Sequence, residues 1–142
     1  MAFVPSESIN LFSDFKIGKI KCDYLLFEMK NASIEVSQQG NCGADWDNFV
    51  EILKSHGCCW AAYHFSFKTS AGERSKLILV RWIPTLTSAK DKMKYAMWSG
   101  VIKAALPGIQ HIIQACDLAE LHKTEILSKV SRFERDAVVS EL

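Results

Sequence analysis

Residues 90–103 read KDKMKYAMWSGVIK, a stretch that has helical character and two apolar sides. At about 100° of rotation per residue, Tyr95 and Trp98 fall on one long aromatic side that suits a protein core. Met93 and Met97 fall on roughly the opposite side. Because one helix cannot bury both sides against one sheet, the methionine side is either covered by another part of the chain or open to a partner.

Both explanations of the methionine side are physically reasonable. Apolar stripes on helices are more often core than binding site. Methionine also adapts its shape to a bound surface, and the lysines around this stripe would attract acidic groups. A basic amphipathic segment with a tryptophan is typical of calmodulin targets and membrane-surface helices as well. Those two alternatives need a detachable segment, whereas Pro84 and the strand-like runs on either side tie this one into the fold.

Length and composition limit the class of protein. The 142 residues fit one domain over 1–142, and 49% hydrophobic with 23% charged residues is ordinary for a chain that folds unaided. A formal net charge of +1 argues against a nucleic-acid binder that works through bulk charge. No apolar run approaches the roughly 18 residues that span a bilayer, so we expect a soluble protein without stable membrane insertion. The five cysteines form no disulfide framework, which favours a reducing, intracellular location.

Periodicity and turn signals predict an α/β (α+β mixed) fold. Runs of alternating or β-branched residues predict strands, and apolar residues three and four apart predict helices. Strands are expected over 22–29, 33–38, 59–67, 76–83 and 109–115, and helices over 6–15, 45–55, 88–106 and 121–133. Five strands and four helices in this order indicate a central mixed sheet sandwiched by helices.

Three blocks of this pattern together resemble the actin-depolymerising factor (ADF)/cofilin family. They are KLILVRWIP at 76–84, KDKMKYA at 90–96 and LPGIQ at 106–110. In that family a strand ending in Trp-x-Pro leads to a long helix opening with Lys-x-Lys-Met-x-Tyr, and a Gly-Ile turn leads to the last strand. The helix near Ser6, the Lys-Ile-Gly at 16–18 and the YLLFEM strand at 24–29 follow the family order, so the resemblance covers nearly the whole chain.

The resemblance implies the ADF-homology fold and a monomeric protein that binds monomeric and filamentous actin and promotes filament disassembly. It also implies that the protein needs no cofactor and has a cytoplasmic, cytoskeletal location. By position, the contact with both actin forms would involve a flexible N-terminal arm and the start of the long helix: Ala2, Phe3, Val4, Lys90, Lys92, Met93 and Met97. The filament-specific contact would involve Arg74 and Lys76, with Lys129 and Arg132 matched more loosely.

The chain departs from the family pattern in two places. Many members have a phosphorylated serine after the initiator methionine, but Ala2 and Phe3 stand here and Ser6 is the nearest hydroxyl. Within the long helix, residues 98–100 (Trp-Ser-Gly) replace the common Ser-Lys-Asp, and 103–105 (Lys-Ala-Ala) replace a lysine cluster. We therefore expect no phosphorylation switch of the usual kind and weakened binding of phosphoinositides.

Two other functions remain open at the level of sequence. A divergent relative could mainly sequester monomers, or bind filaments without strong severing. A thiol or metal enzyme is more remote: His56 precedes Cys58 and Cys59, and His64 lies in the next strand. No recognised catalytic signature is present, and two cysteines that open an apolar strand indicate core positions.

Overall fold

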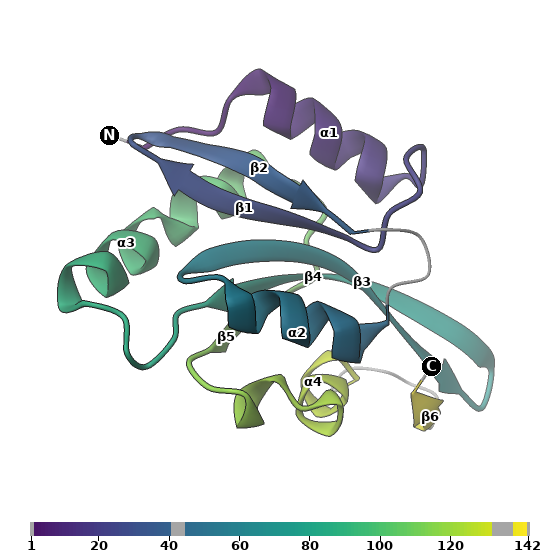
Figure 1. The fold of residues 1–142 in the computed structure, drawn as a ribbon. Helices are drawn as coiled ribbons and strands as arrows, with labels where there is room; N and C mark the ends of the chain where they lie inside the picture. Colours follow the sequence, from purple (N-terminus) through teal and green to yellow (C-terminus); the bar gives the residue numbers. More distant parts are fainter. Residues whose placement is uncertain (1, 41–44, 132–137, 142) are drawn as a thin grey trace.

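A computed structural model describes residues 2–40, 45–131 and 138–141 (Figure 1). The strands are β1 (Tyr24–Lys30), β2 (Ser33–Gln39), β3 (Cys59–Thr69), β4 (Gly72–Trp82), β5 (His111–Ala115) and β6 (Val138–Glu141). The helices are α1 (Ser6–Lys16), α2 (Trp46–Ser55), α3 (Ala89–Ala105) and α4 (Lys123–Val130), with a short 3₁₀ turn η1 (Ala119–Leu121) before α4. No helix among the described residues is long and apolar enough to cross a membrane.

One mixed sheet organises these elements. Its strand order is β2-β1-β3-β4-β5, and β6 pairs with the far end of β3. The first four strands of that path pair antiparallel, whereas β4 and β5 run parallel. Parallel neighbours need a crossover connection, and α3 provides it. This topology carries α3 across one face of the sheet, as Figure 1 shows.

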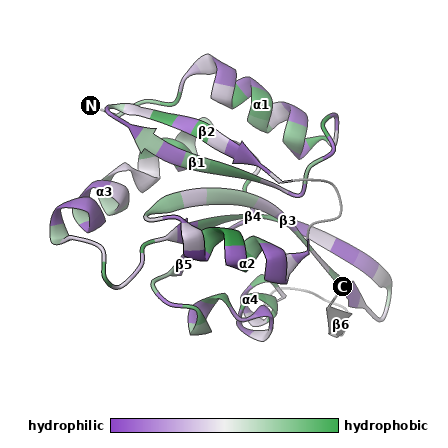
Figure 2. Cartoon of the chain, in the orientation of Figure 1, coloured by the Kyte–Doolittle hydropathy of each residue, from purple (hydrophilic) through white to green (hydrophobic). Residues whose placement is uncertain are grey.

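Helices cover both faces of the sheet. One core cluster joins the sheet to α1 and α3, with Phe12, Trp60 and Ile102 fully buried. The other joins it to α2 and α4, with Phe49 and Ile126 fully buried. Strongly hydrophobic residues along β4 and in the middle of α2 lie between the layers (Figure 2). The predicted mixed sheet between helical layers is confirmed.

Local signals explain where α3 begins and ends. The Ser88 hydroxyl accepts a hydrogen bond from the Asp91 N–H at 3.2 Å, the usual N-cap contact. Beyond the helix, Gly108 has a φ of 102°, which glycine adopts without strain. The Lys16 ammonium donates to the Pro107 carbonyl at 3.1 Å, which ties the end of α1 to the end of α3.

Some boundaries differ from the sequence expectation. The predicted helix over 121–133 is the η1 turn followed by α4, which begins at Lys123. Residues 132 and 133 lie outside the described residues. The sixth strand, Val138–Glu141, was not predicted, because its partner on β3 is about seventy residues away in the sequence.

Candidate functional site

The two sides of α3 differ sharply in burial. Ile102 is 0% exposed, and Tyr95 and Trp98 pack half-buried against the same core. Met93 is 66% exposed and Met97 58% exposed. The methionine side is therefore open to solvent rather than covered by the described parts of the chain. The explanation that another part of the chain covers the methionine stripe therefore does not hold for the described residues.

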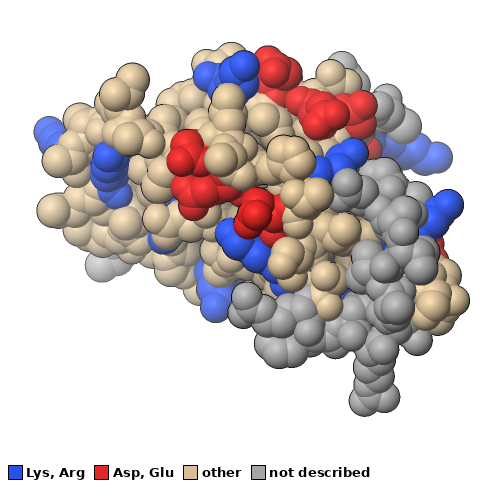
Figure 3. Space-filling model, turned by 90° about the horizontal axis from the view of Figure 1, so that it is seen from below, with Lys and Arg blue, Asp and Glu red and all other residues tan. Residues whose placement is uncertain are grey.

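Lysines border the exposed methionines. Lys90 and Lys94 are exposed, and Lys92 is half-buried. Within the described residues, none of these three ammonium groups has a carboxylate at ion-pair distance. Figure 3 shows basic side chains among uncharged atoms at the left-hand end, where α3 lies in Figure 1. The surface thus combines an apolar stripe with unpaired positive charge.

A polar junction beneath α3 fixes how the helix is rotated. The Ser99 hydroxyl accepts hydrogen bonds from the Trp60 indole at 3.1 Å and from the Arg81 guanidinium at 3.0 Å. It donates its own proton to the Tyr95 carbonyl at 2.7 Å. The Arg81 guanidinium also donates to the side-chain oxygen of Gln114 on β5. One hydroxyl therefore connects α3 with β3 and β4, and through Arg81 with β5.

Tyr95 anchors the same side of α3 toward β1. Its ring centroid lies 4.5 Å from that of Trp60, and its hydroxyl oxygen accepts a hydrogen bond from the Met29 backbone N–H at 3.3 Å. Burial, the largest cause, raises the pKa of the Tyr95 hydroxyl above its ordinary value. These contacts, together with Ser99, hold Met93 and Met97 on the outer side.

The N-terminal arm is paired with the sheet, whereas the sequence suggested a flexible arm. The Phe3 N–H donates to the Ala32 carbonyl at 2.9 Å, and the Ile34 N–H donates to the Phe3 carbonyl at 2.8 Å. Ala2 is only 5% exposed and belongs to the core, so its side chain is not available to a partner. Phe3 is 55% exposed, and Val4 is half-buried. Of the three expected arm contacts, Phe3 offers the largest surface.

The second set of expected contacts lies away from α3. Arg74 and Lys76 are half-buried on β4, opposite Phe67 and Phe65 of β3. This end of the β3–β4 hairpin lies across the molecule from α3 in Figure 1. Lys129 is half-buried on α4. Arg132 lies outside the described residues. Arg74 and Lys76 are thus separated from the start of α3, in keeping with the two sets of contacts that were expected.

Cys58 and Cys59 have the environment of core residues. Cys58 is 8% exposed and Cys59 0% exposed, and burial raises the pKa of both thiols. A thiol nucleophile needs a lowered pKa, so these surroundings oppose that chemistry. His64 contacts the Phe15 carbonyl at 3.1 Å, a structural role. Among the described residues, no three histidine, cysteine or acidic side chains gather as metal ligands would.

Comparisons with known proteins identify the relatives of this chain. The family model described as Cofilin/tropomyosin-type actin-binding protein matches residues 1–131. Cofilin of Kluyveromyces lactis is 33% identical over 132 residues, which is 91% of this chain and 92% of that protein. Actophorin of Entamoeba histolytica is 31% identical over 129 residues, 89% of this chain and 93% of that protein.

Solved structures of similar proteins share the fold. The crystal structure of Streptomyces griseoflavus cofilin has a TM-score of 0.84 at 31% identity and covers 93% of this chain and 98% of its own. The solution structure of ADF/cofilin from Trypanosoma brucei has a TM-score of 0.72 at 31% identity, and the match covers 92% of this chain and 95% of that chain. The chain belongs to the cofilin/tropomyosin-type actin-binding protein family. It is accordingly an actin-binding protein with the fold of the ADF/cofilin proteins.

Proposed function

We propose that this chain, folded as a single domain over 1–142, binds both monomeric and filamentous actin and accelerates the disassembly of filaments in the cytoplasm. The observation that supports this proposal best is the exposed side of α3, where Met93 and Met97 lie among lysines that have no acidic partner within the described parts of the chain. An adaptable apolar stripe edged with ammonium groups complements a partner that has an apolar cleft and an acidic surface. Names of relatives alone do not place this contact on α3.

The contact with both actin forms would consist of Phe3, Lys90, Lys92, Met93 and Met97. Val4 and Ala2 would support it from beneath, because Ala2 packs in the core and Val4 is half-buried. Association would bury the methionine side chains and bring the ammonium groups close to carboxylates. Removing a desolvated lysine from such a contact costs about 2 to 5 kcal/mol, whereas a lysine at the rim mainly changes the association rate.

The contact made only with filaments would involve Arg74, Lys76, Lys129 and Arg132. Arg74, Lys76 and Lys129 lie on β4 and α4, apart from the start of α3. A filament presents two neighbouring subunits, so two separated surfaces on one molecule can each meet a different subunit. This separation supports two distinct surfaces, one that contacts an actin monomer and one that makes contact only in the filament.

Phosphoinositide binding would be weak. Ala104 is exposed and Ala105 half-buried on the last turn of α3, where the family pattern has lysines. Each missing lysine removes about 1 kcal/mol of attraction to an anionic lipid surface. The protein would act as a monomer. It would catalyse no thiol reaction, since the buried thiols lack the environment of a nucleophile.

Filament cosedimentation combined with light scattering tests the proposal. We expect the protein to pellet with filaments and, at higher ratios, to increase the actin that remains in the supernatant while scattering falls. Binding without loss of polymer would favour a stabilising role. Loss of polymer without pelleting of the protein would favour monomer sequestration, the alternative that the sequence left open.

A further inference from the structure

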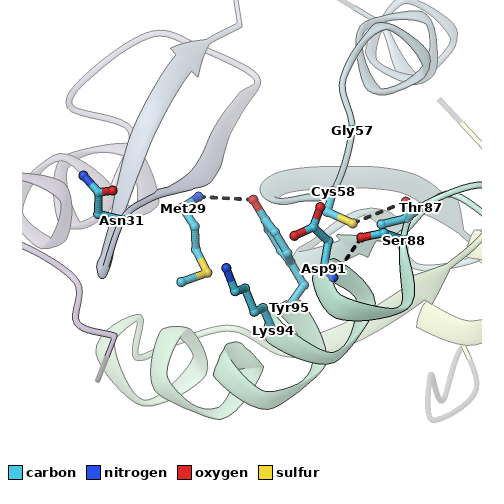
Figure 4. A pocket seen from close by; sticks show the side chains of 9 residues that line it. All are labelled: Met29, Asn31, Gly57, Cys58, Thr87, Ser88, Asp91, Lys94 and Tyr95. Carbon is cyan, nitrogen blue, oxygen red and sulfur yellow. Dashed lines mark hydrogen bonds between the residues drawn. The ribbon is translucent and has the colours of Figure 1, made fainter.

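A pocket of about 500 Å³ lies beside the start of α3 (Figure 4). Three segments that are far apart in the sequence form its walls. They are the end of β1 with its turn (Met29, Asn31), the link before β3 (Cys58) and the first turns of α3 (Asp91, Tyr95). The volume falls within the range of about 300 to 1,000 Å³ that is typical of binding pockets in proteins.

Hydrogen-bond donors dominate the part of the pocket nearest β1. The Tyr95 hydroxyl oxygen accepts from the Met29 N–H, and its own proton has no acceptor among the described residues. The Lys94 ammonium also has no acceptor there, and it points into the space between Met29 and Tyr95 (Figure 4). An ammonium and a hydroxyl therefore face the same hollow with bonding capacity to spare.

Among the described residues that line the pocket, Asp91 is the one acidic side chain. It lies one helical turn before Lys94, nearer to Cys58 and Ser88 (Figure 4). No ion pair within 4.0 Å joins it to Lys94 in the described part of the chain. Its carboxylate therefore leaves the Lys94 charge uncompensated, and it would repel an acid that entered the pocket.

The pocket lies between the two parts of the proposed actin contact. On one side, Phe3 is hydrogen-bonded to Ala32, the neighbour of the pocket residue Asn31. On the other side, Lys90 and Met93 lie on the same first turns of α3 as Asp91 and Lys94. A partner that touches both Phe3 and the flank of α3 that carries Lys94 would reach the mouth of the pocket.

We propose that the pocket receives an acidic side chain of the bound actin, with the incoming carboxylate held by the Lys94 ammonium and the Tyr95 hydroxyl. This inference rests on the proposed function and adds Lys94 to the contact. Charge-assisted hydrogen bonds to a carboxylate are short and strong, and partial burial in the pocket strengthens them further. The negative charge of Asp91 limits the affinity of the pocket for the incoming carboxylate.

Charge-changing variants of the pocket test this assignment by the sign of their effects on affinity for monomeric actin. Lys94→Met keeps the apolar stem and removes the charge, and we expect about tenfold weaker binding. Asp91→Asn removes the repulsion and should tighten binding by about threefold. Lys94→Arg, which keeps the cation, should bind within about twofold of the parent protein. Lys103→Met, on another flank of the same helix, is the matched control and should bind like the parent.

Each other pattern of affinities overturns the assignment. Tighter binding by Lys94→Met together with weaker binding by Asp91→Asn would mean that a basic side chain enters the pocket. Parent-like affinity for both variants would mean that actin leaves the pocket uncovered. Failure of the parent protein itself to bind actin would instead refute the proposed function, so the two failures are distinguishable. Circular dichroism and thermal midpoints of all four variants would exclude changes in folding as the cause.

Discussion

The Ser99 hydroxyl accepts a hydrogen bond from the Arg81 guanidinium at 3.0 Å, which places a cationic group directly beneath α3. Arg81 belongs to β4, so this bond crosses from the sheet to the helix that carries the exposed methionines. Ser99 also accepts from Trp60 and donates to Tyr95, so all its hydrogen-bonding capacity is used. The Ser99 hydroxyl therefore contributes to fixing the rotation of α3 about its axis, together with the contacts of Tyr95.

Ser99→Val and Ser99→Thr form a pair of nearly equal shape that separates the hydroxyl from its volume. Valine leaves the donors of Trp60 and Arg81 without their acceptor, and we expect a loss of about 1 to 3 kcal/mol in the free energy of unfolding. Threonine keeps the hydroxyl and should lose less. Urea unfolding of both variants measures the difference. Equal losses would show that the added methyl group, not the hydrogen bonds, decides stability.

Replacing both exposed methionines should weaken actin binding without affecting the fold. Met93→Ala with Met97→Ala removes apolar surface that lies in solvent in the free protein, so the free energy of unfolding should change by less than about 0.5 kcal/mol. Affinity for actin should fall by about 1 to 3 kcal/mol, because burying such side chains contributes roughly that much. Isothermal titration with monomeric actin measures the change.

Ile17→Ala is the control for the methionine variant. Ile17 is 72% exposed, comparable with Met93, but it follows α1 rather than lying on α3. This variant should bind actin like the parent protein. Equal weakening by Ile17→Ala would indicate a general effect of surface hydrophobicity and would remove the special role of the α3 stripe.

Arg74→Ala with Lys76→Ala should separate filament binding from monomer binding. Both residues lie on β4, at the end of the β3–β4 hairpin away from α3. We expect parent-like affinity for monomers and at least about tenfold weaker cosedimentation with filaments, the size expected for a close interfacial charge pair. Comparable loss of both activities would show that this end of the hairpin belongs to the monomer contact.

The regular spacing of α3 predicted from the sequence which residues share each side of the helix, whereas the exposure of the methionine side follows only from the structure. Helical geometry alone places Tyr95 opposite Met93 and Met97, and the core selects the aromatic side. The order of strands and helices was predictable for the same reason, since each element repeats with its own period. Such signals are local, which is why they are already present in the sequence.

Features that depend on contacts distant in sequence could not be predicted in this way. Ser99, Arg81 and Gln114 come together only because three elements pack against one another, and no residue spacing in the sequence indicates this contact. Burial of Ala2 follows from the pairing of Phe3 beside β2, which also lacks a periodic signal. The sequence places Lys94 at the border of the methionine stripe, but the pocket beside it forms only because the turn after β1 lies next to the start of α3.

His111 on β5 predicts a modest pH dependence of stability. Burial, and after it the positive charge of Lys76, lowers the pKa of His111 in the folded protein. The unfolded chain therefore binds more protons, and stability contributed by neutral His111 is lost as pH falls through the ordinary histidine pKa of about 6.5. Urea unfolding of His111→Gln and the parent at pH 7.5 and 5.5 checks this. The parent should lose more stability than the variant over this interval, and an equal or smaller loss in the parent would contradict the sign.

Affinity for monomeric actin after the double change Lys90→Ala and Lys92→Ala tests most directly whether the start of α3 is the docking surface. Both lysines border the exposed methionines, and neither has an acidic partner within the described chain. We expect monomer binding to fall below detection at micromolar concentrations while the circular dichroism spectrum stays that of the parent protein. Parent-like affinity of this double variant would contradict the assignment of the actin contact to α3.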